Sequence, residues 1–169
     1  VKVAVSYAGS FVDAAKGKEL GLAQYRSGVA IGFTAASQAG LGQLSAAKET
    51  GHYVLGVDSD QEAIFASSDP GIASQVVSSV LKNVDVSLLQ AYDLYAEGKL
   101  PFGTGKAVGL AEGAVGLVET GNMAKLATPE VLAAVKAAEQ KIASGEIKVP
   151  TAFGMSTEDI SKLRDGVRP

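Results

Sequence analysis

The chain has 169 residues, enough for one ordinary domain, and its 47% hydrophobic content suffices to bury a core. Its formal net charge of −3 argues against a nucleic-acid-binding surface, which needs a basic stripe. The absence of cysteine excludes disulfides, thiolate catalysis and cysteine zinc sites, and a single histidine argues against a histidine metal cluster or catalytic triad. Because no apolar run reaches about 18 residues, we expect no membrane-spanning helix.

Residues 1–60 alternate between short apolar runs and helical stretches. The apolar runs over residues 1–7, 29–33 and 53–57 predict strands. Between them, one helix is expected from Asp13, a capping residue, to about residue 27, and a second helix is expected to end at Thr50. Short buried strands separated by helices are typical of βαβ units, so the sequence predicts an α/β fold with a parallel sheet and right-handed crossovers.

The second half of the chain predicts a less regular series of elements. These are a strand over 75–80, a helix over 83–97, two small strands over 107–110 and 114–118, a helix from Thr128 to Gly145, and a last short helix opening at Ser156. Within the helix over 83–97, Tyr92 and Tyr95 are spaced as core residues would be. His52, at a helix-to-strand junction, is interpreted as structural.

Three loops follow the predicted strands, and ligands of open parallel sheets bind beyond the carboxyl ends of strands. The loops over 9–11, 36–38 and 58–60 provide an aromatic ring (Phe11), small residues that let a ligand approach the backbone, and a carboxylate (Asp58). A ring can stack on Phe11 and hydroxyls can donate to Asp58. Because the loops are poor in basic residues, they favour an uncharged ligand with a flat ring and hydroxyls over a phosphate.

Each candidate also has a purely structural interpretation. Phe11 could pack beneath the first helix, and Asp58 or Asp60 could act as turn or capping residues. Lys82 could form an exposed ion pair with the neighbouring Asp85. The segment Gly40-Leu41-Gly42 partly matches a dinucleotide-binding loop, but it starts seven residues after Phe33 and Ser45 stands in the place of the third glycine.

Six segments occur in one order along the chain: VAVSYAGSF (3–11), AAKGKELGLAQ (14–24), GLGQLSAAKE (40–49), YVLGVDSDQ (53–61), SVLKNVDV (79–86) and GEIKVP (145–150). Together they resemble the second, C-terminal lobe of the basic membrane protein family, the purine-nucleoside-binding lipoproteins of ABC transporters. GVDSDQ is the most specific block, and the resemblance extends to Pro150.

The resemblance implies a type I periplasmic-binding fold, in which two α/β lobes clamp a nucleoside between them. Residues 1–150 would form a three-layer lobe over a parallel sheet, without its first strand and helix, and residues 151–169 a tail with a short helix. Since Val1 is not an initiator methionine, we expect the chain to be a piece of a longer protein. The missing strand would leave an exposed sheet edge through which the chain could associate with itself.

The resemblance also implies which residues bind the ligand. Phe11 would stack on the base, Ala36 with Ser37 and Asp58 would bind the ribose, and Lys82 would line the cleft. This sequence departs from the family at two places. Ser37-Gln38 stands where two glycines are usual. In the second strand, Ala30 stands where an aspartate is usual and Gly32 where an aliphatic residue is usual.

The expected function is therefore nucleoside capture for an ABC transporter. The expected partners are the missing N-terminal lobe and the transporter permease. No catalysis, cofactor or metal is expected. The expected location is the cell envelope, either periplasmic or lipid-anchored outside the cytoplasmic membrane. Three alternatives stay open. The chain could be a lobe of a receptor for another small polar ligand such as a sugar, an α/β enzyme that uses Asp58 or Asp60 as a base, or a half-domain that binds nothing.

Overall fold

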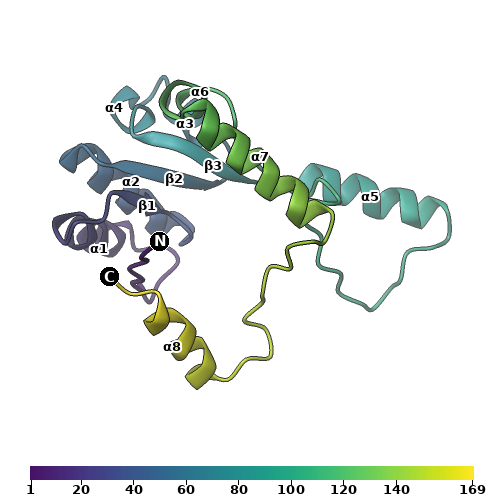
Figure 1. The fold of residues 1–169 in the computed structure, drawn as a ribbon. Helices are drawn as coiled ribbons and strands as arrows, with labels where there is room; N and C mark the ends of the chain where they lie inside the picture. Colours follow the sequence, from purple (N-terminus) through teal and green to yellow (C-terminus); the bar gives the residue numbers. More distant parts are fainter.

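A four-stranded sheet forms the centre of the structure, a computed structural model that describes residues 1–169 (Figure 1). Its strands, in spatial order, are β1 (Ile31–Phe33), β2 (Tyr53–Asp58), β3 (Val76–Lys82) and β4 (Val115–Leu117). The first three run parallel, and β4 pairs antiparallel with β3. The predicted α/β class is confirmed, with a parallel sheet that becomes mixed only at its last strand.

Eight helices accompany the sheet: α1 (Ala14–Arg26), α2 (Gln38–Thr50), α3 (Gln61–Phe65), α4 (Pro70–Ala73), α5 (Val84–Ala96), α6 (Asn122–Leu126), α7 (Pro129–Ala143) and α8 (Thr157–Gly166). The longer ones lie where the sequence predicts them, and Asp13 caps α1 by accepting from Lys16 N at 2.9 Å. α3, α4 and α6 were not predicted, because four or five residues are too few to establish a helical periodicity. None of the helices combines the length and hydropathy needed to cross a membrane.

The core lies between the sheet and the helix pair α1 and α2. Leu44 of α2, Val54 of β2 and Val76 of β3 are fully buried there. The two helices cross so closely that a Cβ atom at Gly42 would overlap the backbone of Ala14. Both glycines of Gly40-Leu41-Gly42 lie inside α2. Gly42 lets α2 approach α1, and Gly40 lets it approach the backbone of Thr34, so the partial match to a dinucleotide-binding loop is accounted for by packing.

Two of the predicted strands are wrong. Residues 1–7 are extended but pair with no strand, and their contacts are to other elements: Val3 N donates to Val167 O at 2.7 Å, and Gln24 Nε2 donates to Ala4 O at 3.4 Å. A cavity separates this segment from β1, as described below, so no strand partner is within reach. Residues 107–110 form no strand either, because Glu112 Oε2 accepts from Gly109 N at 2.8 Å and turns the chain there.

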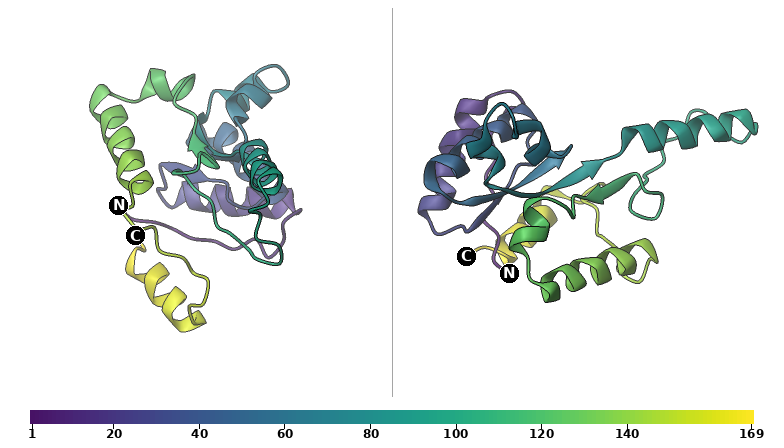
Figure 2. Two further views of the ribbon diagram at one scale, coloured as in Figure 1. Left: turned by 90° about the vertical axis from the view of Figure 1, so that its right-hand side faces the viewer. Right: turned by 90° about the horizontal axis from the view of Figure 1, so that it is seen from above.

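The expectation that Tyr92 and Tyr95 belong to the core is also wrong. Helix α5 extends away from the sheet into open space (Figure 2). The two side chains are 65% and 61% exposed, respectively. Their spacing is that of one helix face, as predicted, but no helix or strand covers that face, and only the Phe102 ring of the following loop meets Tyr95 edge-on.

Candidate functional site

Three of the predicted ligand residues stand at the carboxyl ends of neighbouring parallel strands. Ser37 follows β1, Asp58 is the last residue of β2, and Lys82 is the last residue of β3. The register pairs Asp58 with Leu81, which brings Lys82 beside it, and Lys82 Nζ lies 2.9 Å from Asp58 Oδ1. The alternative pairing of Lys82 with Asp85 is not formed. A carboxylate and an ammonium thus share this edge, hereafter called the rim.

Ser37 and Asp58 are the two residues other than glycine with a positive φ, at 53° and 72°. This region of backbone space is costly for a residue with a side chain, and such residues cluster where function requires a particular shape. Ser37 precedes α2 without capping it through its side chain, so its hydroxyl is uncommitted. At both positions the chain turns sharply as it leaves a strand, and both side chains are exposed at the rim.

Phe11 is held near Ser37 by its own loop. Ala39 N, in the first turn of α2, donates to Phe11 O at 3.1 Å. Ser10 Oγ accepts from the backbone of Val12 at 3.1 Å and stiffens the same loop. The Phe11 ring is 77% exposed, so it does not pack beneath the first helix.

The remaining candidates have simpler roles. Ala36 is half-buried, and its N–H donates to Thr34 O at 2.6 Å. Asp60 Oδ1 accepts from Ala63 N at 3.1 Å, so Asp60 caps α3, as its structural interpretation has it. Nowhere in residues 1–169 do three or more histidine, cysteine or acidic side chains group as metal ligands would.

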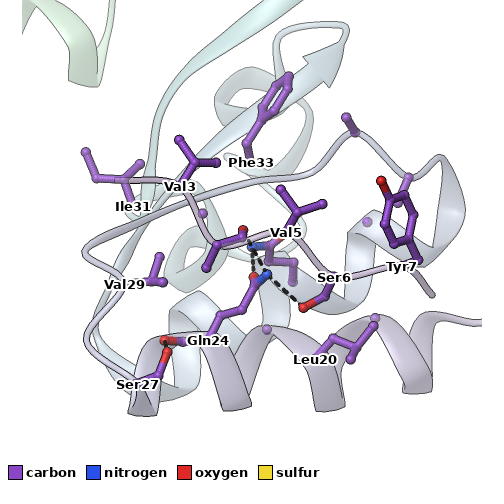
Figure 3. Close-up of a pocket in the computed structure, with 18 of the residues that line it drawn as sticks. Val3, Val5, Ser6, Tyr7, Leu20, Gln24, Ser27, Val29, Ile31 and Phe33 are labelled. Atoms are coloured by element: carbon purple, nitrogen blue, oxygen red, sulfur yellow. Dashed lines mark hydrogen bonds between the residues drawn. The ribbon is translucent and has the colours of Figure 1, made fainter. Parts of the chain in front are cut away.

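The rim is open surface, whereas a large cavity lies elsewhere. That cavity, of about 760 Å³, runs between residues 1–8 and β1 over α1 (Figure 3). Ala36 lines one end of it, but Phe11, Ser37, Asp58 and Lys82 do not. The rim residues therefore present one wall for a ligand and do not enclose it.

The pairing of Lys82 with Asp58 is the feature of the rim that sequence reasoning missed. The signal was present, because both residues closely follow apolar runs that were themselves predicted as strands. What was lacking was the strand order: only adjacency of β2 and β3 brings the two side chains together.

Comparison with known proteins adds an independent line of evidence. Residues 1–152 match the protein family described as ABC transporter substrate-binding protein PnrA-like. The chain is 35% identical over 161 residues to the ABC transporter nucleoside-binding protein BmpA of Lactococcus lactis subsp. cremoris (strain MG1363), a match that covers 89% of this chain and 44% of that protein. It is 36% identical over 153 residues to basic membrane protein D of Borreliella burgdorferi (strain JD1), covering 89% of this chain and 42% of that protein.

A solved structure gives the same picture of the fold. An ABC transporter solute-binding protein from Aeropyrum pernix K1 matches with a TM-score of 0.69 at 26% identity, covering 96% of this chain and 50% of that one. The predicted fold, an α/β lobe of a periplasmic-binding protein, is confirmed. The chain spans half or less of the length of each of these proteins.

Proposed function

Because the chain belongs to the PnrA-like family of ABC transporter substrate-binding proteins, we propose that it is one lobe of a receptor that captures nucleosides, purine nucleosides in particular. Residues 1–150 form this second lobe, without the first strand and helix of a complete lobe, and residues 151–169 form a tail. Its partners are the other lobe, which closes over the ligand, and an ABC transporter permease. The receptor works in the cell envelope, periplasmic or lipid-anchored outside the cytoplasmic membrane. The Lactococcus relative is named as a nucleoside-binding protein, which supports this assignment.

The observation that carries the proposal is the Asp58–Lys82 pair at the end of two neighbouring strands, with the Phe11 ring exposed at the same rim. Asp58 retains an unpaired carboxylate oxygen that can accept from ribose hydroxyls, and Lys82 can donate to the same sugar. Phe11 offers its face to a purine ring. Ala36 and Ser37 are small enough for the sugar to lie close to the backbone.

A single lobe provides only half of such a site. A small-molecule pocket normally buries most of its ligand, and the rim of this chain can cover one side only. The ligand loses the same translational and rotational entropy whether one lobe or two lobes hold it, but one lobe makes only part of the contacts. We therefore expect weak binding by the lobe alone.

A lobe of a sugar receptor is the second candidate. The hydroxyl of Ser37, which caps nothing, and the adjacent amide of Gln38 favour it, because they add polar groups at the place where a sugar would lie. Catalysis by Asp58 has less support. The carboxylate is engaged by Lys82, and the histidine of the chain, His52, is stacked on Tyr25 with ring centroids 4.7 Å apart. We propose binding without turnover.

A pair of aspartate variants tests the proposal. Guanosine is titrated into the isotope-labelled chain, and binding is followed by backbone amide chemical shifts. Asp58→Asn removes the charge at the rim, and we expect it to weaken guanosine binding roughly tenfold or more, the usual effect of losing a hydrogen bond to a charged group.

Asp60→Asn is the matched control, because Asp60 lies two residues from Asp58 as the N-cap of α3 and asparagine also caps helices. It should bind guanosine as the unchanged chain does. Equal affinities for the two variants would remove Asp58 from the site. If ribose alone changes the backbone amide chemical shifts as much as guanosine does, the result would favour the sugar receptor.

A further inference from the structure

Gln61 is the first residue of α3 and the last residue of the GVDSDQ block, and it ties both ends of the turn that carries Asp58. Its side-chain Nε2 donates back to Val57 O at 3.2 Å, just before the turn. Its backbone N–H donates to Ser79 Oγ of β3 at 3.1 Å, just after the turn. Residues 58–60 therefore form a loop whose two ends are held by the same residue.

Val57 O needs the glutamine as a donor because no strand supplies one. Leu55 O accepts from Thr34 N at 3.2 Å, on the β1 side of the sheet. Carbonyl groups alternate in direction along a strand, so Val57 O points to the same side. The pairing of β1 with β2 ends at Phe33 and Leu55, before it reaches Val57. The amide of Gln61 therefore takes the place of a strand partner at the end of β2.

The packing beneath the turn makes room for these two bonds. Ser79 is fully buried, and it pairs with Gly56 in the register of β2 and β3. A Cβ atom at Gly56 would overlap Ser79 Oγ and would lie 3.1 Å from Gln61 Cβ. The absence of a side chain at position 56 thus lets the serine and the glutamine meet. Gly56, Gln61 and Ser79 are hereafter called the clamp.

The second oxygen of the glutamine amide indicates that Gln61 does more than fill space. Val57 O is only an acceptor, so Nε2 must face it and Oε1 must point away. Oε1 is buried there, and no donor of the chain reaches it. A buried acceptor without a partner lowers stability, and an apolar side chain of similar size would avoid this loss. What the glutamine adds over a methionine is the bond to Val57 O.

We propose that Gln61 and Ser79 are positioning residues, which hold Asp58 at its positive φ of 72° and so keep its carboxylate at the rim beside Lys82. In this role neither residue contacts the ligand. Without the clamp, the backbone of Asp58 relaxes to the negative φ that residues with a side chain prefer, and the carboxylate leaves its place. The consequence for ligand binding rests on the proposed function, whereas the consequence for the backbone of Asp58 does not.

Gln61→Met tests the proposal, because methionine keeps the length of the side chain and removes the donor. The first measurement is the NOE between the amide proton and Hα of Asp58, which is strongest at positive φ because these two protons are then closest. The second is guanosine affinity, from backbone amide chemical shifts. We expect the NOE to weaken and the dissociation constant to rise at least about threefold, as it does when the binding conformation is populated a third of the time.

Gln140→Met is the matched control, because Gln140 is exposed on α7 and lies outside the rim. It should leave both the NOE and the affinity unchanged. Ser79→Ala is a second test, since it removes the acceptor at the other end of the turn, and we expect it to weaken the NOE and the affinity as Gln61→Met does. Slow amide exchange at Val54 and Val76 confirms that each variant is folded.

A strong NOE at Asp58 in folded Gln61→Met and Ser79→Ala would overturn the proposal, as would a weakened NOE with unchanged guanosine affinity. If Gln61→Met binds guanosine fully while Asp58→Asn does not, the positioning role is wrong and the proposed function stands. If the unchanged chain binds no guanosine, the proposed function is wrong. The NOE at Asp58 then decides by itself: its weakening in Gln61→Met supports the clamp, and its persistence overturns it.

Discussion

Ser37 and Asp58 show how single residues shape the rim. Each has a positive φ that costs about 1–3 kcal/mol for a residue with a side chain. The family that the sequence resembles usually has glycine at position 37, and the positive φ gives a physical reason for that preference. This chain makes the turn with a serine at that position. The neighbouring interactions must therefore hold this backbone shape in place, among them the bond from Gly40 N to Ser37 O at 3.0 Å.

Tyr25 is the residue of the core whose ionisation is most strongly perturbed. It is 3% exposed, stacks on His52, and donates from its hydroxyl to Tyr53 O at 3.1 Å. Burial raises the pKa of Tyr25 to about 12, partly opposed by a hydrogen bond with the backbone of Gly32. The contact also explains the structural role predicted for His52, whose ring covers the tyrosine.

A pH dependence follows from this shift. Because the folded pKa of about 12 lies above the ordinary value of about 10, protonated Tyr25 stabilises the fold fully below pH 10, and this contribution is lost as the pH rises toward 12. Between pH 8 and pH 11 the loss should be about 1 kcal/mol. Urea unfolding of the unchanged chain and of Tyr25→Phe at pH 8 and pH 11 checks this loss of stability. The comparison isolates Tyr25, because the other titratable groups contribute equally to the stability of the two proteins. A stability difference between the two proteins that stays constant from pH 8 to pH 11 would contradict the assignment.

The crossing of α1 and α2 is the element-scale contact that holds the core together. Gly17 of α1 and Gly42 of α2 let the two backbones approach to van der Waals contact. This contact presses α2 against β2, where Leu44 and Val54 are fully buried. Stability at this crossing therefore depends on the absence of a side chain.

We expect Gly42→Ala to lower the free energy of unfolding by about 3 kcal/mol, the upper part of the range for overpacking, because the new methyl group would meet the backbone of Ala14. Gly105→Ala is the control, since a Cβ there meets nothing within 4 Å. Urea unfolding midpoints compare the two. Equal midpoints would mean that the helices separate without cost and that the crossing does not support the core.

The elements that the sequence predicts well are those whose signals are local. Caps, helical spacing and apolar runs correctly place α1, α2, β2 and β3, because each signal lies within the element itself. The strand expected over residues 1–7 fails for a different reason: its alternating apolar residues carry the right pattern, but a strand also needs a neighbour. The position of Asp58 after an apolar run was readable, whereas its contact with Lys82 depends on strand order.

At the scale of the whole molecule, the chain leaves several apolar surfaces exposed. One face of the sheet is covered by α1 and α2, and on the other face Ile31, Phe33 and Tyr53 are 50%, 51% and 41% exposed. Helices α5 and α7 extend from the sheet (Figure 2). Exposed apolar surface of this extent is typical of an interaction surface. The Lactococcus and Aeropyrum relatives are about twice as long as this chain.

The central claim is that the rim is one wall of a site for an uncharged molecule made of a ring and a sugar. Its most direct test is an amide-shift titration of the unmodified chain with inosine. The prediction is a dissociation constant of about 1 mM or weaker, with the largest shifts at Phe11, Ser37 and Asp58. Micromolar binding by the monomeric chain would contradict the half-site, and shifts confined to residues away from these three would contradict the site itself.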